Sequence, residues 1–134
     1  MGEYVLGDLK MAPKGALMSE EYAKANTTLP GKTLYINETS VLFDQKTFYH
    51  YSTEKMNRDK ARRYFNIYGG YADLLCGGSI DENGFATGEL DVYVFCAEEY
   101  HIITVVLNQK GELMLWLTLD QYEYMGFYEL IPAE

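Results

Sequence analysis

Cysteine, histidine and tryptophan are scarce in this chain of 134 residues, which contains two, two and one of them respectively. The cysteines, Cys76 and Cys96, are too few for a disulfide framework, and they do not form the C-x-x-C spacing of a metal or redox site. We expect two buried free thiols, or one disulfide if the protein is exported. The histidines, His50 and His101, have no further metal ligands at short spacing, so the sequence indicates no metal site and no cofactor.

Long apolar runs are also missing. No stretch reaches the roughly 18 apolar residues of a membrane span, so we expect no membrane-spanning segment. The first ten residues, MGEYVLGDLK, lack the basic head and the apolar stretch of a signal peptide. The protein is cytoplasmic if Met1 is its native start, and exported if a leader once preceded Met1. The sequence leaves the compartment open between these two.

Basic residues are nearly absent from the second half of the chain. Residues 64–134 contain only Lys110 against 12 acidic residues, whereas residues 1–63 contain the other 10 Lys and Arg against 8 acidic residues. Residues 64–134 therefore carry a net charge of −11 and residues 1–63 a net charge of +2, within the total of −9. Because an acidic surface repels phosphate backbones and anionic membranes, general nucleic-acid binding is disfavoured.

Recognisable catalytic patterns are missing as well. The glycines form neither of the two common phosphate-binding motifs, and no pair of acids stands apart from the general acidic surface. Cys96 precedes His101 across an expected hairpin turn, but it shares an apolar face with Leu90, Val92 and Val94. An apolar setting raises the pKa of a thiol and makes it inert. We therefore expect no catalytic residue and no enzymatic activity.

Hydrophobic and aromatic residues are abundant instead, at 48% and 15% of the chain, and 13 residues are tyrosine. Tyrosine and β-branched residues suit half-buried pleated surfaces, so the composition favours sheet, in a single domain over residues 1–134. Extended runs separated by turn residues predict nine or ten strands. The expected strands are 3–9, 33–36, 40–43, 47–51, 64–68, 74–76, 90–97, 101–107, 113–119 and 122–131.

Helical signals are few. Ser19 is a good N-cap followed by two glutamates, which predicts one short N-terminal helix that ends before Pro30. The polar segment 53–63 is either a loop or one exposed helix. Asn83-Gly84 is a strong hairpin signal and predicts a turn within residues 79–85.

Two of the expected strands, 101–107 and 113–119, are apolar on both faces. In the second of them, leucines at alternate positions face one way while Met114 and Trp116 face the other. A sheet with one face in water does not have this pattern, so another element covers the outside of a curled sheet, or the outside is an oligomer contact such as a homodimer interface. We expect an antiparallel up-and-down barrel or a strongly curled sheet, since closure removes exposed edges.

The order of elements carries a family resemblance. An expected strand is followed by the short helix SEEYAK at 19–24, by GKTLYINETSVLFD at 31–44, and by a final meander that ends in MGFYEL at 125–130. In this order the chain resembles the small bacterial lipocalin-like, or calycin-type, domains. The resemblance implies an up-and-down barrel around an apolar cavity, with 31–44 as its second hairpin. It assigns no functional residue.

Aromatic side chains are the candidates for lining such a cavity and for contacting a small apolar ligand. The alternative is a filled core, because the interiors of small barrels are packed with side chains. The candidate lining residues are Tyr49, Tyr51, Tyr93, Phe95, Trp116 and Phe127.

A basic cluster holds 5 of the 11 basic residues within nine positions. It predicts a rim patch for an anionic head group or a docking partner, or else a solvated segment that balances the acidic remainder of the chain. Solvation is the usual role of such a run. The cluster consists of Lys55, Arg58, Lys60, Arg62 and Arg63.

Two functional hypotheses follow. The first is a non-enzymatic binding domain with a small apolar or amphipathic ligand in the barrel. The second is an acidic protein-interaction module, inhibitor or immunity-like, with a solid core. An open apolar cavity favours the first hypothesis, and a packed interior with an exposed acidic or apolar patch favours the second.

Overall fold

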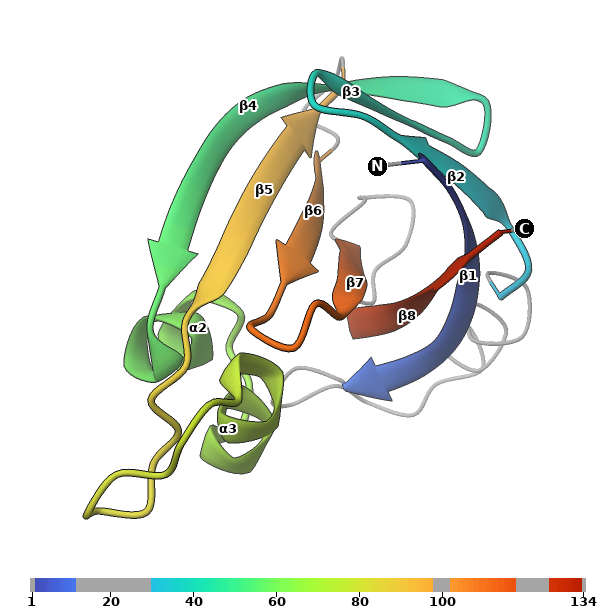
Figure 1. The fold of residues 1–134 in the computed structure, drawn as a ribbon. Helices are drawn as coiled ribbons and strands as arrows, with labels where there is room; N and C mark the ends of the chain where they lie inside the picture. Colours follow the sequence, from blue (N-terminus) through green and yellow to red (C-terminus); the bar gives the residue numbers. More distant parts are fainter. Residues whose placement is uncertain (1, 12–29, 98–101, 118–125, 134) are drawn as a thin grey trace.

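A computed structural model describes residues 2–11, 30–97, 102–117 and 126–133 of the chain. Eight antiparallel strands form a closed barrel in which each strand pairs with its neighbours in sequence, and β8 pairs with β1 (Figure 1). The described ranges also contain two short helices, which lie outside the barrel. The elements are β1 (Gly2–Met11), β2 (Thr33–Ile36), β3 (Ser40–Phe43), β4 (Lys46–Met56), α2 (Arg58–Tyr64), α3 (Gly69–Cys76), β5 (Leu90–Cys96), β6 (Ile102–Leu107), β7 (Leu113–Leu117) and β8 (Gly126–Pro132).

The antiparallel barrel predicted from the sequence is confirmed, but two of the expected strands are not strands. The described residues contain eight strands and not nine or ten, because residues 64–68 are the end of α2 and its connection to α3, and residues 74–76 belong to α3. The short extended runs there were misleading: Ile67 is a buried connector between α2 and α3, and Leu75 and Cys76 are buried side chains of α3. The helix expected after Ser19 lies outside the described residues.

Helix α2 has a clear local cause. Its N-cap is Asn57, whose side-chain oxygen accepts a hydrogen bond from the Lys60 backbone N–H at 2.9 Å. Asp59 lies in the first turn, and Arg62 and Arg63 lie in the last turn, as the helix dipole favours. These signals stand in the polar segment 53–63, which therefore forms the end of β4 followed by a helix.

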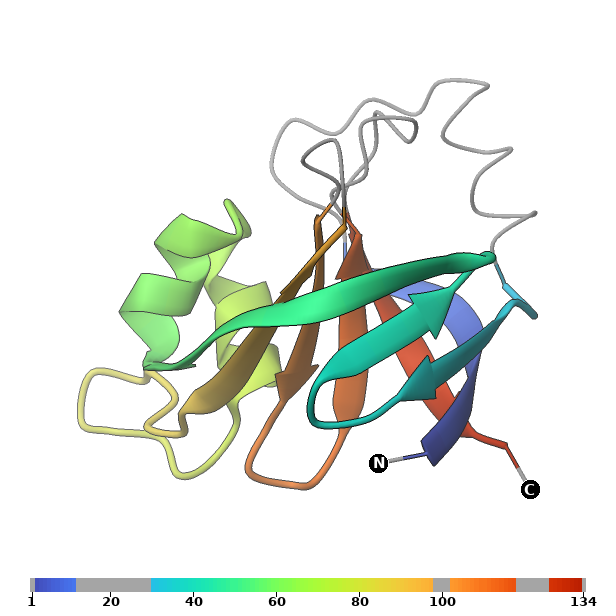
Figure 2. The ribbon, with the colours of Figure 1, turned by 90° about the horizontal axis from the view of Figure 1, so that it is seen from above.

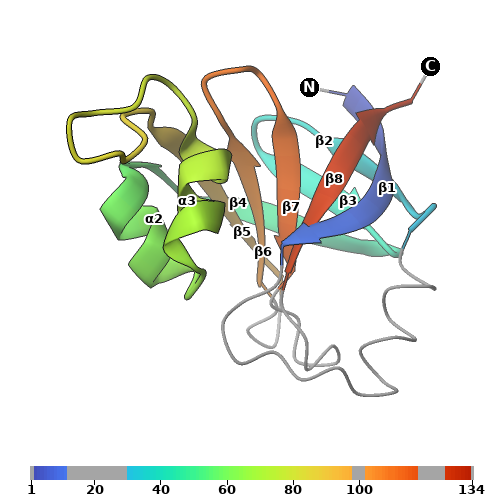
Figure 3. The same ribbon diagram turned by 90° about the horizontal axis from the view of Figure 1, so that it is seen from below.

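Helix α3 depends more on its packing. It starts with two glycines and has no side-chain N-cap bond, and it stops at Gly77, whose φ of +66° favours glycine. Ala72, Leu75 and Cys76 recur at helical spacing and are buried against the barrel. Figures 1 and 3 show α2 and α3 side by side outside the barrel, near the end of β4 and the start of β5.

The interior of the barrel is an apolar core. Inward side chains from all eight strands meet in one cluster, in which Tyr128 and Phe43 are among the largest fully buried residues. The cluster consists of Leu6, Leu34, Ile36, Val41, Phe43, Phe48, Phe95, Ile103, Val105, Leu115, Leu117, Tyr128 and Leu130. The barrel is therefore largely filled with side chains, as in other small barrels.

A second core lies between the barrel and the helices. Phe65 at the end of α2 packs edge-on against Trp116 and Phe127, with ring centroids 5.0 and 4.8 Å away. The same cluster contains Met114 at its edge and Leu75 of α3. The outward apolar side chains of β7 are thus covered by helices, which is the first of the two solutions that the sequence allowed. No oligomer contact is needed to explain them.

The wall formed by β2 and β3 has only one buried face. Burial alternates residue by residue, with Leu34, Ile36, Val41 and Phe43 inside. Their neighbours Tyr35 and Leu42 are register partners on the outside and are 50% and 41% exposed. In Figure 1 this wall lies across the barrel from α3.

Candidate functional site

A small apolar pocket lies inside one end of the barrel, where the β6–β7 turn and the β2–β3 turn are found. Its volume is about 180 Å³. The lining side chains are apolar apart from the hydroxyl of Tyr93, and they come from β2, β5, β6, β7 and the β6–β7 turn. They are Ile36, Tyr93, Phe95, Val105, Leu107, Gly111 and Leu113.

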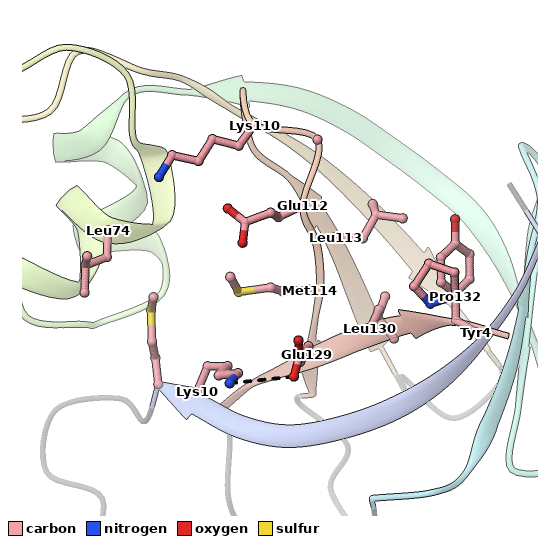
Figure 4. Close-up of a pocket in the computed structure, with 12 residues that line it drawn as sticks. Tyr4, Lys10, Leu74, Lys110, Glu112, Leu113, Met114, Glu129, Leu130 and Pro132 are labelled. Carbon is pink, nitrogen blue, oxygen red and sulfur yellow. Dashed lines mark ion pairs between the residues drawn. The ribbon is translucent and has the colours of Figure 1, made fainter.

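A larger groove of about 610 Å³ lies on the neighbouring side of the β6–β7 turn (Figure 4). Leu74 of α3 borders one part of the groove, while Tyr4, Leu130 and Pro132 of the β1–β8 pair border another. Met114 lies between these parts, on β7. Charged residues of both signs line the middle of the groove: Lys10, Lys110, Glu112 and Glu129.

The charges of the groove are partly engaged. Lys10 Nζ lies 3.6 Å from Glu129 Oε2, as the dashed line in Figure 4 marks. Asn108 Nδ2 donates to Glu112 Oε1 at 3.1 Å, and the side-chain oxygen of Asn108 accepts from the Lys110 backbone N–H at 3.0 Å. Among the described residues, no ion pair to the ammonium group of Lys110 is found. Lys110 is therefore the cation that the groove can offer to an anionic group.

The apolar pocket and the charged groove meet at the β6–β7 turn. Gly111 and Leu113 line both of them. Gly111 has a φ of +83°, a conformation that favours glycine. The glycine therefore permits the backbone conformation of this turn. The arrangement places an apolar hollow directly beside a hollow with charged residues.

The six aromatic residues predicted to line a cavity separate into three groups. Tyr93 and Phe95 line the barrel pocket. Trp116 and Phe127 are register partners that point outward into the core under the helices, so they do not line the interior. Tyr49 and Tyr51 are 64% and 75% exposed. Strand alternation in β7 and β8, and a bulge in β4 between His50 and Ser52, decide these directions.

The residues of the basic cluster lie at the end of β4 and in α2. Lys55 pairs with Asp91 at 2.9 Å, Arg58 pairs with Asp59 and Asp73, and Lys60 pairs with Glu54 at 2.6 Å. The hydrogen bond to Asp91 raises the pKa of Lys55. Arg62 and Arg63 lie in the last turn of α2, outside the barrel. Most of these charges are thus balanced by acids within the molecule.

Arg58 joins three segments. Its Nε donates to Asp73 Oδ1 at 2.9 Å, which connects α2 to α3, and its guanidinium carbon lies 4.2 Å from the centroid of the Phe85 ring. Asp73 Oδ1 also accepts from the Ala86 backbone N–H at 3.0 Å. A Cβ at Gly69 would come within 2.5 Å of Arg58 Nη2, so a side chain there would displace the guanidinium from this position. The role of Arg58 is structural.

The cysteines are free thiols, as one of the two expectations had it, but only Cys76 is buried as expected. Cys76 is buried in α3, and burial raises the pKa of its thiol to about 11. Cys96 is partly exposed, and burial raises the pKa of its thiol above the ordinary value. Neither thiol is activated. His101, the expected neighbour of Cys96, lies outside the described residues.

The other histidine, His50, contacts a threonine and a phenylalanine. His50 Nε2 and Thr53 Oγ1 lie 2.7 Å apart in a hydrogen bond, and the His50 ring contacts Phe95 edge-on. Within the described ranges, no three His, Cys, Asp or Glu side chains group closely enough to hold a metal ion. The helices described here are all too short or too polar to cross a membrane.

Comparisons with protein-family models, with curated protein sequences and with solved structures each find no match to this chain. The class that the described residues define is a closed eight-stranded antiparallel barrel, with α2 and α3 packed on its outside.

Several lining residues were not predicted from the sequence. Leu107 and Leu113 of the pocket, and Lys110 of the groove, belong to strand ends and to a turn that the sequence located correctly. The isolated position of Lys110 in the acidic half was the one signal that pointed to it. Its place in the groove depends on where α3 packs.

Proposed function

We propose that this chain is a non-enzymatic binding domain that holds a small apolar or amphipathic ligand at the end of the barrel that contains the apolar pocket. The observation that carries the proposal is the meeting of the apolar pocket and the charged groove at Gly111 and Leu113. The barrel of eight antiparallel strands also supports membership of the lipocalin-like class, which is part of the proposal.

The size of the pocket restricts the ligand. Its 180 Å³ is close to the roughly 150 Å³ of an engineered apolar cavity that binds benzene, and below the roughly 300 Å³ of most ligand sites. The pocket therefore suits one ring or a short alkyl chain. A polar part of the same molecule would lie in the groove, where Lys110 suits an anionic group.

The first test is native mass spectrometry of the protein purified from its own host. A co-purifying small molecule of defined mass supports the proposal and identifies the ligand class. Hexanoate, an amphipathic anion with a short alkyl chain, serves as a probe in a calorimetric titration. We expect Leu107→Trp to abolish hexanoate binding by filling the pocket, whereas Leu42→Trp on the exposed wall should leave it unchanged. No bound molecule in the host protein, together with no hexanoate binding, would contradict the proposal.

A second candidate function is the acidic protein-interaction module. The packed barrel interior and the exposed side chains of Tyr35, Leu42 and Tyr49 favour it, because large exposed apolar groups often mark contact surfaces. The same mass spectra distinguish the two functions. A protein partner at fixed stoichiometry, with no small molecule, would favour the interaction module.

A further inference from the structure

Strand β4 is paired on both sides over only a small part of its length. It pairs with β3 through residues 46–49, and with β5 through residues 49–56. The last hydrogen bond toward β3 runs from the His50 backbone N–H to the Thr39 carbonyl at 2.9 Å. Figure 2 shows the green ribbon of β4 continuing past β3 toward α2.

Within the described ranges of the chain, residues 51–56 of β4 therefore form a sheet edge in an otherwise closed barrel. In an antiparallel pair, successive residues direct their backbone N–H and C=O groups alternately toward and away from the neighbouring strand. Among the described residues, no strand and no turn supplies hydrogen-bond partners on the outer side of 51–56. Such a row of free backbone groups is a template for another extended chain.

The usual guards against edge pairing are weak here. Proteins protect sheet edges with charges, prolines and bulges. A bulge lies at the start of this edge, between His50 and Ser52. The two charged residues of the edge, however, form ion pairs within the molecule. Glu54 pairs with Lys60 of α2, and Lys55 pairs with Asp91 of β5. The edge thus carries no unbalanced charge of its own.

The apolar barrel pocket lies beside this edge. Thr53 of β4 is the register partner of Tyr93, which lines the pocket, and Thr53 is exposed on the same inward face. Ile36, at the end of β2, lines the pocket on the other side of the gap that β3 leaves. A strand added along β4 would therefore direct alternate side chains toward the pocket.

We propose that residues 51–56 of β4 bind an extended peptide segment of a partner protein by strand addition. The backbone edge selects an extended chain, and the pocket of about 180 Å³ selects an apolar side chain on its inward face. The net charge of −9 favours a partner segment that carries basic residues, through long-range attraction. The proposal deepens the second candidate function, since it names the surface and the chemistry of the partner.

The experiment uses the full chain and the peptide acetyl-Lys-Leu-Lys-Val-Lys-Leu-Lys-amide, in which apolar and basic residues alternate. Nuclear magnetic resonance titration measures the affinity, and amide hydrogen exchange locates the bound strand. We expect protection to rise within residues 51–56. Two N-methylated peptides are matched controls, with the methyl groups on alternate backbone amides. One of the two should lose binding and the other should retain it, because only one set of amides faces β4.

A pair of threonine variants tests the position on the protein. Thr53→Lys places an ammonium group where the apolar side chain enters, and we expect it to weaken peptide binding about tenfold or more. Thr47→Lys adds the same charge on the same strand at a residue that pairs with Leu42 of β3, and it should leave the affinity within about twofold. Circular dichroism checks that both variants are folded.

Strand addition is overturned if the peptide does not bind at millimolar concentration, if both N-methylated peptides bind equally, or if Thr53→Lys binds as well as Thr47→Lys. A concentration-dependent dimer whose interface protects residues 51–56 also overturns it, because the edge would then bind a second copy. A partner that co-purifies with the host protein but protects other residues leaves the interaction function standing and excludes this surface.

Discussion

Strands β5–β8 and strands β2–β3 belong to one closed sheet, yet they bury different numbers of faces. In β7 the inward Leu115 and the outward Trp116 are both buried, whereas in β3 the inward Val41 is buried and the outward Leu42 is exposed. The difference follows α2 and α3, which cover one wall and leave the other bare. A sheet with two apolar faces needs a second layer over its outer face. In this barrel the wall of β5–β8 has such a layer, whereas the wall of β2–β3 has one apolar face and no such layer.

The largest expected effect breaks the covered wall. Phe65→Ala should lower the free energy of unfolding by about 3–5 kcal/mol, because it leaves a cavity between α2 and the aromatic rings of Trp116 and Phe127. Tyr49→Ala removes an aromatic ring that is 64% exposed and should change the stability by no more than about 0.5 kcal/mol. Urea denaturation followed by Trp116 fluorescence measures both. Equal losses would contradict the two-wall comparison.

A smaller effect is expected where the helices are joined to each other. Arg58→Ala removes the hydrogen bond to Asp73 and should cost about 1.5–3 kcal/mol, since bonds to charged groups are worth about that much. Arg63→Ala, an exposed arginine of the same helix, is the control, with an expected loss below about 0.5 kcal/mol. The same denaturation experiment applies. If Arg58→Ala behaved like the control, the covering layer would not depend on this bond.

The smallest effect depends on pH and concerns the buried thiol of α3. Because burial raises the pKa of Cys76 to about 11 from the ordinary 9.0, the unfolded chain ionises first. The stability that the neutral thiol contributes is complete below pH 9 and is lost as pH rises toward 11. We expect the wild-type chain to lose more stability over this range than Cys76→Ala, in parallel urea titrations at each pH. Parallel curves for the two proteins would show that the thiol titrates alike in both states.

The strands were largely predictable because their signals are local. The ranges expected at 33–36 and 40–43 agree with β2 and β3, and Asn37 forms the predicted turn by accepting hydrogen bonds from the backbone N–H groups of Thr39 and Ser40. Strand β4 extends five residues beyond the range expected to end at Tyr51, to Met56, although its later residues are polar. Pairing with β5 supplies the hydrogen bonds that composition did not indicate.

The candidate site was harder to predict, because it depends on which way side chains point and on where separate elements pack. Tyr93 and Phe95 were expected in the pocket and are found there, since they lie on or close to the regular inward alternation of β5. Trp116 and Phe127 were expected there too, but their strands place them on the opposite face. The sequence shows that two faces alternate, while the closed barrel decides which face is inside.

The sequence by itself determined an acidic, mostly antiparallel β domain with strands that need cover on both faces, because alternation, turn residues and charge are properties of neighbouring positions. Only the tertiary structure decided that α2 and α3 supply this cover, that the β6–β7 turn separates a pocket from a groove, and that β4 extends beyond its pairing with β3. Each of these depends on contacts between residues far apart in the chain, for which a single sequence contains no local signal.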